Sequence, residues 1–532
     1  MRLLLLACVA FLAVVLFLGV SSTARNGGDF TYPLDDSYIH LAVAKNLGTT
    51  GVWGINPDAF SAVSSSLSWP LLLTLFGAAL AWGEWVPLVL NLVFGIWVLV
   101  IANRWMVEER VGTLVRAAAL AGFVFVVPIG VLAFVGLEHV LQIALALLLL
   151  HWATARANGP DPAQLRRAAL IAMLLVATRF EGLFLIAAIV LYLWRIRRLD
   201  MGALLVMAGG FPLVVFGSLS IVFGGRFLPT PLWMKGRLSS ELIPALKAAG
   251  TDPVGWVQVL GDFLVLAPLR SLSEVGVLAW LVLLALSWAL WARPRRRRLT
   301  AVWIVLATTW MHLTFARTGW LGRYEAWLVA MLIVVLTPFA QELWAGPIRK
   351  RWALRIAVPL LLAGFALMPV RVRVASGLFQ ANRGSTNIHE QQVQMARFLG
   401  EYRQGEAVAL NDIGAVGYFA GVECVDLWGL SDIEVAGRRI SGRLNAVELG
   451  WLAHERDVQV AAMYESVLDE TGGVPTEWHA VSDWTINRNA VCGSARVTWY
   501  ATSSDAAPRL KAELREWSTQ LPATVAVRWH GE

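Results

Sequence analysis

Charged residues are scarce in this chain of 532 residues: Asp, Glu, Lys and Arg make up 15% of it, while hydrophobic residues make up 57%. Soluble domains typically contain about 25% charged residues. With a mean hydropathy of +0.61, the chain lacks the polar surface that a soluble globular enzyme needs. The abundance of apolar residues also excludes an intrinsically disordered protein, and the 45 glycines and 21 prolines follow no collagen-like period. The class that remains is a multi-pass membrane protein.

Cysteine and metal-binding motifs are scarce as well. The chain has three cysteines and no CxxC, HExxH or clustered histidine motif, so we expect no metal site. Cys424 and Cys492 both lie in a polar C-terminal region, where a disulfide and two separate buried thiols are equally open. The sequence contains no internal repeat of fixed period.

Eleven apolar segments can cross about 30 Å of hydrocarbon, if short or tilted members are allowed. They are residues 3–20, 85–105, 113–134, 138–155, 166–179, 181–194, 201–223, 274–292, 299–316, 325–344 and 352–370. We keep the first as a span because no clear signal-peptide cleavage site follows it. Residues 71–81 are apolar but short, and counting them as a span would invert every basic loop downstream. We therefore predict a re-entrant or in-plane helix there.

Lys and Arg are distributed unequally between alternate loops. With the N-terminus in the cytoplasm, 19 of the 44 Lys and Arg fall in cytoplasmic loops, and ten fall in the longer outer loops before residue 371. Cytoplasmic loops are generally enriched in these residues, so we predict a cytoplasmic N-terminus. The run Arg295–Arg298 then anchors the topology, and the net charge of +7 predicts no nucleic-acid partner.

An odd number of spans places the C-terminal region on the outer side of the membrane. Residues 371–532 are more polar and combine a helical pattern at 388–403 with strand-like runs at 407–410, 458–462 and 524–527. We therefore predict two domains, a transmembrane domain over 1–370 and an extracytoplasmic α/β domain over 371–532.

The unusual polar residues gather in the outer loops, whereas the span interiors are nearly free of charge. Asn91 and His312 are the main interior polar residues, and we expect structural hydrogen bonds for both. The first outer loop, 21–84, carries an adjacent pair of carboxylates, Asp35 and Asp36. Residues 36–47 suit an amphipathic helix along the membrane, with Gly48 as its C-terminal stop. The pair can cap this helix or act as a general base with a supporting partner.

Other outer connections add cations and carboxylates around one potential cavity. They contribute Glu138 and His139, Arg179 and Glu181, Lys235 and Arg237, and Arg317, Arg323, Tyr324 and Glu325. Each group alone can be a local ion pair or an interfacial side chain. Taken together, the cations suit a phosphate, and the acidic pair suits activation of a hydroxyl.

These motifs resemble those of a known superfamily. The stretch Asp35-Asp36-Ser-Tyr-Ile-x-x-Ala-x-x-x-Asn46-Leu, with the following Gly51-x-x-Gly-x-Asn56, is similar to the first outer loop of GT-C glycosyltransferases that use polyprenyl-phosphate sugars. Within that superfamily, the chain most resembles the terminal arabinofuranosyltransferase (AftB-like) branch. This branch has comparable Gly-Leu-Glu138, Thr-Arg-x-Glu181-Gly, Leu-Pro-Thr-x-x-x-x-Lys235, Arg323-Tyr324 and Asp412-x-Gly-Ala-x-Gly417 stretches. The resemblance covers nearly the whole chain.

The resemblance implies a fold, a reaction and a site. The fold is a GT-C-like polytopic α-helical membrane protein of about 11 transmembrane helices with a C-terminal α/β extracytoplasmic domain. The reaction is an inverting sugar transfer from a polyprenyl-phosphate donor to a glycan, lipid or protein acceptor, at the outer face of a bacterial cytoplasmic membrane. Asp35 accepts the acceptor proton and Asp36 supports it. Donor and phosphate binding falls to Arg323, Lys235, Arg179, Arg237 and Tyr324. The substrate pocket includes Tyr38, His40, Asn56, Glu138, His139 and Glu181.

Two other functions stay open at this stage. A lipid-linked sugar flippase or transporter predicts paired charges at the membrane midplane, and a noncatalytic polytopic assembly protein leaves Asp35 dispensable. A polyprenyl phosphate can leave without help from a metal, so the transferase needs no cofactor, and the sequence leaves a divalent metal open.

The C-terminal domain is a candidate for presenting a glycan acceptor. Trp428, Trp451, Trp478 and Trp484 are available to stack on sugar rings, although core packing is the default for such residues. Residues 411–417 contain glycines but lack the Gly-x-Gly-x-x-Gly dinucleotide fingerprint, so we expect no nucleotide there.

Overall fold

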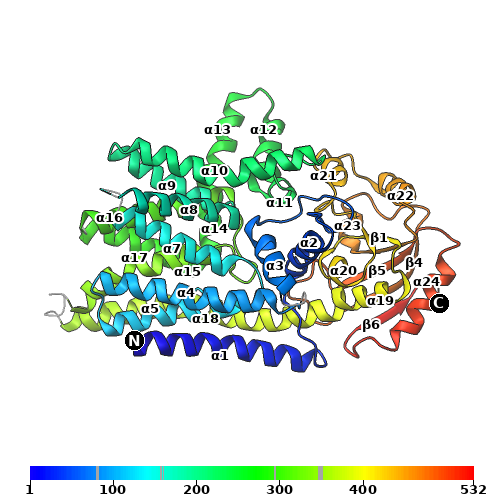
Figure 1. The fold of residues 1–532 in the computed structure, drawn as a ribbon, viewed down its shortest axis with the longest axis horizontal. Coiled ribbons are helices and arrows are strands. Elements are labelled where there is room, and N and C mark those ends of the chain that lie inside the picture. Colours follow the sequence, from blue (N-terminus) through cyan, green and yellow to red (C-terminus); the bar gives the residue numbers. More distant parts are fainter. Residues whose placement is uncertain (80–82, 156–158, 160, 293–294, 346–351, 532) are drawn as a thin grey trace.

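The computed structural model describes residues 1–79, 83–155, 159, 161–292, 295–345 and 352–531. Within these ranges it leaves out the side chains of Lys235, residues 291–292 and residues 352–368. The helical part and a smaller part that contains a sheet lie side by side along the long axis of the molecule (Figure 1).

Each of the eleven predicted spans coincides with a helix, or with two consecutive helical segments. The corresponding elements are α1 (Arg2–Arg25), α4 (Val86–Glu108), α5 (Thr113–Phe125) with α6 (Ile129–Val135), α7 (His139–Ala155), α8 (Pro162–Thr178), α9 (Gly182–Arg195), α10 (Leu199–Val222), α15 (Gly276–Ser287) with a π-helical turn (Trp288–Ala292), α16 (Arg296–Phe315), α17 (Ala326–Ala345) and α18 (Trp352–Ile388).

By length and composition alone, five helices in the described part of the chain can cross a membrane, or six if a bent pair counts as one span. Among the others, α7 and α9 are apolar but shorter than 18 residues. Helix α7 is buried along nearly its whole length among the other helices, so it meets protein rather than lipid. The chain is a multi-pass membrane protein, as its composition predicts. The predicted boundary at 370/371 falls inside α18, which continues toward the sheet.

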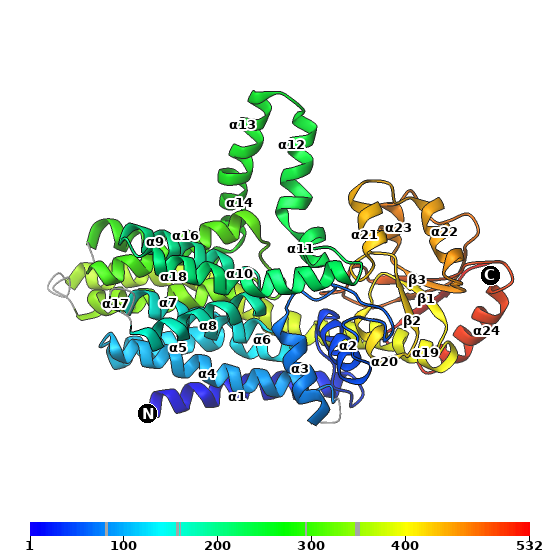
Figure 2. The same ribbon diagram turned by 45° about the horizontal axis from the view of Figure 1, so that its top comes forward.

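Two segments on the outer-loop side depart from simple spans. Helix α3 (Ser68–Ala79) occupies the region predicted as a re-entrant or in-plane helix. After α10 come the short helix α11 (Thr230–Lys235), a π-helical turn (Leu238–Leu242), α12 (Ile243–Ala249), α13 (Pro253–Gly261), a second π-helical turn (Asp262–Leu266) and α14 (Ala267–Glu274). Helices α12 and α13 project from the bundle as a hairpin (Figure 2).

The C-terminal part is an α/β unit, as predicted. Its six strands have the order β2-β1-β3-β5-β4-β6. Strands β1 (Ala407–Leu410), β2 (Glu423–Asp426) and β3 (Val460–Met463) are parallel, and β4 (His479–Thr485), β5 (Arg496–Ala501) and β6 (Ala526–Trp529) continue the sheet in antiparallel pairing. All four residues of β3 are buried, which is typical of a parallel strand covered on both faces. The flanking helices are α19 (Gln394–Tyr402), α20 (Gly414–Phe419), α21 (Ile433–Ile440), α22 (Ala446–Glu455), α23 (Glu465–Asp469) and α24 (Ala507–Ser518).

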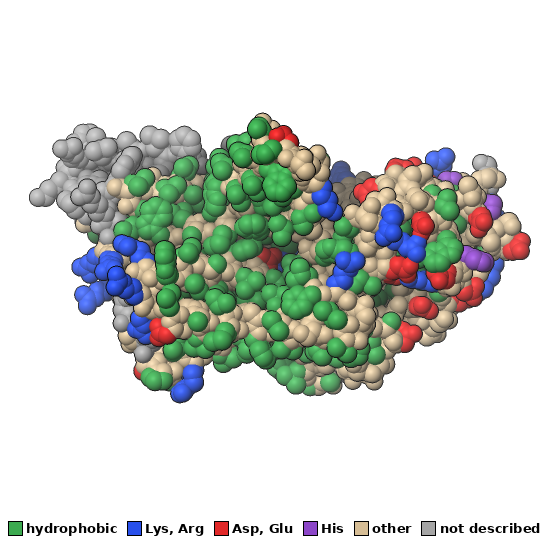
Figure 3. All heavy atoms as spheres, turned by 90° about the horizontal axis from the view of Figure 1, so that it is seen from above, with side chains coloured by type: hydrophobic (Ala, Val, Ile, Leu, Met, Phe, Trp, Pro, Cys, Tyr) green, Lys and Arg blue, Asp and Glu red, His purple; other side chains and the backbone are tan. Residues whose placement is uncertain are grey.

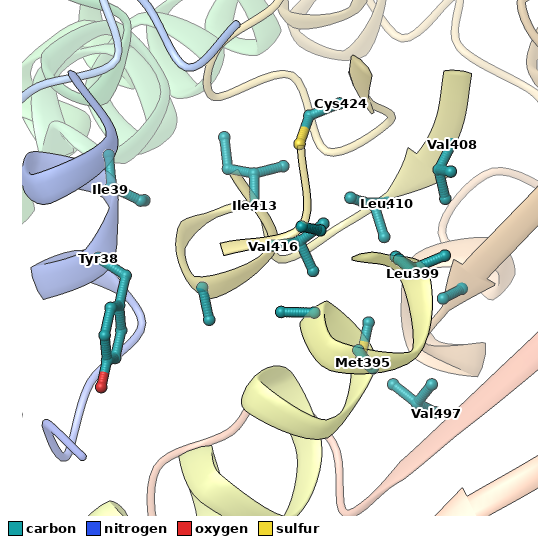
Figure 4. Close-up of a cluster of buried hydrophobic side chains, with 14 of the residues drawn as sticks. Tyr38, Ile39, Met395, Leu399, Val408, Leu410, Ile413, Val416, Cys424 and Val497 are labelled. Atoms are coloured by element: carbon teal, nitrogen blue, oxygen red, sulfur yellow. The ribbon is translucent and has the colours of Figure 1, made fainter. Parts of the chain in front are cut away.

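The first outer loop joins the two parts through helix α2 (Asp36–Thr49). Tyr38 and Ile39 of α2 belong to one hydrophobic core with Val416 of α20 and Leu399 of α19, and Figure 4 shows these side chains together. The C-terminal sheet therefore packs directly on the loop that carries the acidic pair.

Helix α2 differs from its prediction in two ways. It continues past Gly48 to Thr49, and it is buried over residues 37–44 rather than lying amphipathically along a membrane. Burial on all sides is possible because its polar side chains find partners: the Ser37 hydroxyl donates to the Val135 carbonyl at 2.6 Å, and Asn46 donates to the carbonyls of Gly54 and Ile55. An amphipathic pattern in one loop cannot reveal the second partner, which comes from the C-terminal part.

Charged and hydrophobic side chains occupy different parts of the surface. Hydrophobic side chains cover the helical part, acidic side chains cluster on the C-terminal part, and Lys and Arg gather at the far end of the helices (Figure 3). Inside the helical part, the Asn91 amide donates to the Leu137 carbonyl at 3.0 Å, and His312 Nε2 lies 3.2 Å from the Arg317 carbonyl. Both interior polar residues thus have the structural hydrogen bonds that we expected.

Candidate active site

A cavity of about 300 Å³ lies where the outer connections meet. It receives polar side chains from α2, from the α8–α9 connection and from the α16–α17 connection. The predicted site residues in its lining are Asp36, His40, Arg179, Glu181, Arg323 and Tyr324. The remaining wall is largely apolar and includes Phe184, Leu213, Leu232 and Phe315. Residues as distant in the sequence as Asp36 and Tyr324 thus line one site that combines charged and apolar side chains.

Arg323 is the central cation of this cavity. Its Nη2 donates to Asp36 Oδ2 at 2.6 Å and lies 2.9 Å from the Tyr324 hydroxyl. The residue is only 5% exposed, yet its Nε and Nη1 have no hydrogen-bond partner among the described residues. Two unsatisfied donors on a buried guanidinium are costly in a folded protein unless a ligand or water completes them. Arg323 therefore has the donor geometry for an anion in the cavity.

The loop that carries Arg323 is held by a second ion pair. Arg373 of α18 donates to Glu325 at 2.6 Å and to the carbonyls of Val126 and Gly322. Gly322 has a φ of +69°, so a side chain there would be strained, and its Cβ would lie 2.8 Å from the Arg373 guanidinium and displace it. Arg373 lies beyond every predicted span, and nothing in the sequence pattern pointed to it.

Arg179 is more fully occupied than Arg323. Its guanidinium donates to Glu181 at 2.6 and 3.1 Å, to Glu138 at 3.1 Å and to the Ser65 hydroxyl at 3.2 Å. It also lies 5.7 Å from the centre of the Tyr324 ring. Because two carboxylates share this cation, Arg179 acts first as a bridge that orients the wall of the cavity.

Histidine completes the polar wall. The buried His40 places Nδ1 3.2 Å from the Ser64 hydroxyl and Nε2 3.8 Å from Glu138. Burial lowers the pKa of His40 more than the nearby carboxylates raise it, so this imidazole is neutral near pH 7. His139 is also buried, with its ring edge-on to Tyr324 at 6.1 Å, but it lies outside the cavity lining.

Other predicted site residues lie away from the cavity. The Tyr38 hydroxyl accepts the Tyr32 N–H inside the hydrophobic core, because α2 turns that face toward α20. Asn56 pairs with both the N–H and the carbonyl of Cys424, which ties the first outer loop to β2. Arg237 donates to Glu241, to Ser271 and to the Leu313 carbonyl, so it connects three helical segments. The side chain of Lys235 lies outside the described residues.

Asp35 binds the C-terminal part and does not belong to the lining of the cavity. Its Oδ2 accepts the Gly414 N–H at 2.7 Å and its Oδ1 accepts the Ala415 N–H at 2.8 Å. It makes no side-chain capping bond to its own helix; instead, it binds the first turn of α20. Burial and the negative charge of Asp412 raise the pKa of Asp35 to about 7, against the two amides, which lower it.

The described residues of this site do not form a set of metal ligands. Among the described residues there is no group of three or more His, Cys, Asp or Glu that could hold a metal ion. Cys424 and Cys492 are both buried free thiols, which is one of the two alternatives that their positions allow.

Comparisons with solved structures show which fold this chain has. ArnT from Cupriavidus metallidurans bound to undecaprenyl phosphate matches 94% of this chain and 98% of its own, with a TM-score of 0.51 and 13% sequence identity. The chain shares the fold of ArnT. The apo state of the same protein matches with a TM-score of 0.49 and 14% identity, again over 94% of this chain and 98% of its own.

Comparisons of the sequence give one match, which covers part of the chain. Residues 386–500 match a domain of unknown function, DUF8728. No curated protein sequence matches the chain. The matched domain begins near the end of α18 and includes β1 to β5, so it covers most of the part that packs on Asp35.

Proposed function

We propose that this protein is an integral-membrane inverting glycosyltransferase. It transfers a sugar from a polyprenyl-phosphate donor to an acceptor hydroxyl at the outer face of a bacterial cytoplasmic membrane. The observation that carries the proposal is the buried Arg323, which lines the cavity with Asp36 and keeps two donors without a hydrogen-bond partner among the described residues. The ArnT-like fold supports the lipid-phosphate chemistry, since ArnT binds undecaprenyl phosphate.

The donor has a charged phosphate and an apolar chain, and the cavity lining offers charged and apolar side chains for both. Its phosphate accepts hydrogen bonds from Arg323 Nε and Nη1, and its first isoprene units pack against Phe184, Leu213 and Leu232. Burial disfavours the charged guanidinium, but Tyr324 and Asp36 more than compensate, so the pKa of Arg323 is raised. The cation therefore stays charged at every physiological pH.

The reaction breaks one bond at the anomeric carbon and forms another. The acceptor oxygen attacks from the face opposite the phosphate, Asp35 takes the proton of the acceptor hydroxyl, and the C1–O bond to the phosphate breaks. Polyprenyl phosphate leaves with one more negative charge than it carried in the donor. Arg323 stabilises this developing charge most strongly in the transition state, which is where such binding accelerates a reaction.

The two carboxylates have different tasks in this scheme. Asp36 holds Arg323 through the 2.6 Å ion pair, which orients the cation toward the phosphate. Asp35 has a pKa of about 7, and a general base works best when its pKa lies near the operating pH. We assign proton abstraction to Asp35 and positioning of the donor-binding cation to Asp36.

The acceptor approaches along the seam between the first outer loop and the C-terminal part. A second cavity of about 400 Å³ adjoins the first there, and its polar lining includes Asn56, Ser61, Thr230, Asp432 and Arg456. Trp451 is 46% exposed and has the Arg438 guanidinium 4.8 Å from its ring centre, whereas Trp478 and Trp484 are buried in the core. Of these three, Trp451 is the one that a glycan can reach. Trp428 is half-buried beneath Arg439.

The sugar and the orientation in the membrane are part of the same proposal. The resemblance of the first outer loop to arabinofuranosyltransferases makes arabinofuranose the first sugar to test. Lys and Arg gather at the end of the helices opposite the C-terminal part (Figure 3). This distribution supports a cytoplasmic N-terminus and an extracytoplasmic C-terminal domain.

Transfer assays on acidic-pair variants test the proposal. We expect Asp35→Asn to reduce transfer from a synthetic polyprenyl-phosphate sugar by about 10²- to 10⁴-fold, the typical contribution of a general base. Asp36→Asn should mainly raise the donor KM, because it releases Arg323. Release of polyprenyl phosphate by the purified chain in nanodiscs is the measurement.

Asp58 provides a matched control in the same outer loop, since it is an exposed carboxylate. Asp58→Asn should transfer at the wild-type rate. A folded Asp35→Asn variant that also keeps the wild-type rate would show that the assigned base is wrong.

A further inference from the structure

The C-terminal part contacts the acidic pair through the loop that follows β1. Gly414 and Ala415 donate their N–H groups to the two carboxylate oxygens of Asp35. A Cβ on Gly414 would lie 2.2 Å from the main-chain oxygen of Asp35, so the close approach requires glycine. This contact joins residues 379 positions apart in the sequence and leaves little freedom to the Asp35 side chain.

A hydrogen-bonded cluster behind this loop fixes a third carboxylate, Asp412. Its Oδ2 accepts from Gln392 Nε2 at 2.8 Å and from the Tyr464 hydroxyl. The preceding Asn411 accepts the main-chain N–H of Tyr464 at 2.7 Å. Gln392 and Tyr464 are 1% and 3% exposed, so Asp412 is held from two directions by buried donors.

The two amides and the charge of Asp412 act on the pKa of Asp35 in opposite senses. A carboxylate that accepts backbone N–H groups is stabilised in its charged form and becomes a weak base. A like charge nearby has the opposite effect, because it favours protonation. After burial, Asp412 is the largest influence that raises the pKa of Asp35, ahead of the adjacent Asp36. The other titratable groups that face Asp35 are Tyr38 on its own helix, Cys424 of β2, Tyr464 and Cys492.

We propose that Asp412 is a positioning residue for sugar transfer, and that the 411–415 loop makes the C-terminal domain a part of the catalytic centre. Gln392 and Tyr464 anchor Asp412 and with it the loop whose two amides hold the Asp35 carboxylate in one orientation. In its charged form, Asp412 also favours transfer of the acceptor proton to Asp35. The inference rests on the proposed function and deepens it. It gives the C-terminal domain a role in the chemistry itself, in addition to contacts with an acceptor.

The test is the pH profile of kcat/KM for transfer from a synthetic polyprenyl-phosphate sugar by the full chain in nanodiscs. In the wild type, the activity should fall below about pH 7 as Asp35 becomes protonated. Asp412→Asn removes the like charge, so the acidic limb should move to lower pH by on the order of one unit. Asp412→Glu keeps the charge and should keep the limb near its wild-type position.

Asp483→Asn is the matched control within the same domain. Asp483 is also a buried carboxylate, but its partners are Thr498 of β5 and His530, which directly follows β6. This variant should leave the acidic limb in place. Thermal unfolding checks that each variant folds, and the smaller Asp412→Ser replaces Asp412→Asn if the latter does not fold.

The outcomes separate this inference from the proposed function. If the neutral Asp412 variants lose activity uniformly while the acidic limb stays in place, Asp412 has a structural role only and the inference is overturned. If instead Asp35→Asn transfers at the wild-type rate, the assignment of the base fails, whatever the Asp412 variants do. A shifted limb in Asp412→Asn, together with an inactive Asp35→Asn, supports both.

Discussion

At the scale of single residues, the site depends on the difference between two arginines. Arg179 is saturated by Glu138, Glu181 and Ser65, whereas Arg323 keeps two buried donors without partners among the described residues. The sequence places both at outer connections and gives no means to rank them, since hydrogen-bond saturation depends on side chains from distant loops. The structure ranks Arg323 first as the ligand of an anion.

Substitution of Arg323 should impair chemistry more than folding. Arg323→Gln should lower kcat by about 10²- to 10³-fold, comparable with the removal of one transition-state donor elsewhere. Arg323→Lys should recover only part of this loss, because an ammonium group cannot offer the same fork of donors. The measurement is the initial rate of polyprenyl phosphate release at saturating donor.

Arg317 serves as the control for charge alone. It lines the same cavity but is exposed, so Arg317→Gln should change the rate by less than about tenfold, in keeping with the small effect of exposed charges. Equal losses in the two glutamine variants would contradict a specific role for Arg323.

At the scale of elements, the first outer loop is stapled to the sheet of the C-terminal part. The side-chain amide of Asn56 pairs with the edge strand β2 as a backbone amide would. It donates to the Cys424 carbonyl at 3.1 Å and accepts the Cys424 N–H at 2.9 Å. The staple lies on the same seam as the contact between Asp35 and Gly414. It therefore helps to keep the loop and the domain in register.

Loss of this staple should loosen the seam. Asn56→Ala leaves two backbone groups of Cys424 without partners, at an expected cost of about 1–3 kcal/mol. Hydrogen exchange should increase at residues 54–61 and 423–426, and transfer activity should fall because Asp35 is held less firmly. Asn445→Ala, which removes only the N-terminal cap of α22, should raise exchange locally at α22 and leave transfer unchanged. Unaltered exchange along the seam in Asn56→Ala would refute the staple.

The elements were predictable to different degrees. Long apolar runs revealed the spans because hydropathy is a local property, and the strand-like runs at 407–410 and 458–462 correspond to β1 and β3 within a few residues. Strands β2, β4 and β5 were missed, since β2 and β4 carry polar residues among their buried positions. The burial of α2 was not predictable from its loop, because part of its cover, including Leu399 and Val416, lies more than 350 positions away in the sequence.

At the scale of the whole molecule, the cavity lies where the helical part meets the C-terminal part, since its lining includes residues from both. The grouping of Asp36, His40, Arg179, Glu181 and Arg323 in one cavity follows from the topology, which the sequence allowed us to draw. The separation of Asp35 from that cavity, and its contact with the C-terminal domain, did not follow from it. Asp35 and Asp36 are adjacent, but their carboxylates bind different partners. These partners, Gly414 and Arg323, lie far away in the sequence, so the local pattern could not identify them.

The position of the cavity favours a transferase over a transporter. A transporter moves its substrate through the bundle, and its functional charges lie at the membrane midplane. Here the cavity lies at the ends of the helices, beside the C-terminal domain. Its lining combines the buried Arg323 with apolar side chains. On the proposed function, this site holds a lipid phosphate at the membrane surface while a second substrate approaches from outside.

The most direct measurement is the stereochemistry of the product. The purified chain in nanodiscs is given a synthetic polyprenyl-phosphate sugar of known anomeric configuration, with arabinofuranose first in the series, together with an oligosaccharide acceptor, and the new linkage is examined by NMR. We predict a glycosidic bond of inverted configuration, with one polyprenyl phosphate released for each bond formed. A linkage of retained configuration, or movement of the lipid-linked sugar across the bilayer without any new bond, would contradict the account.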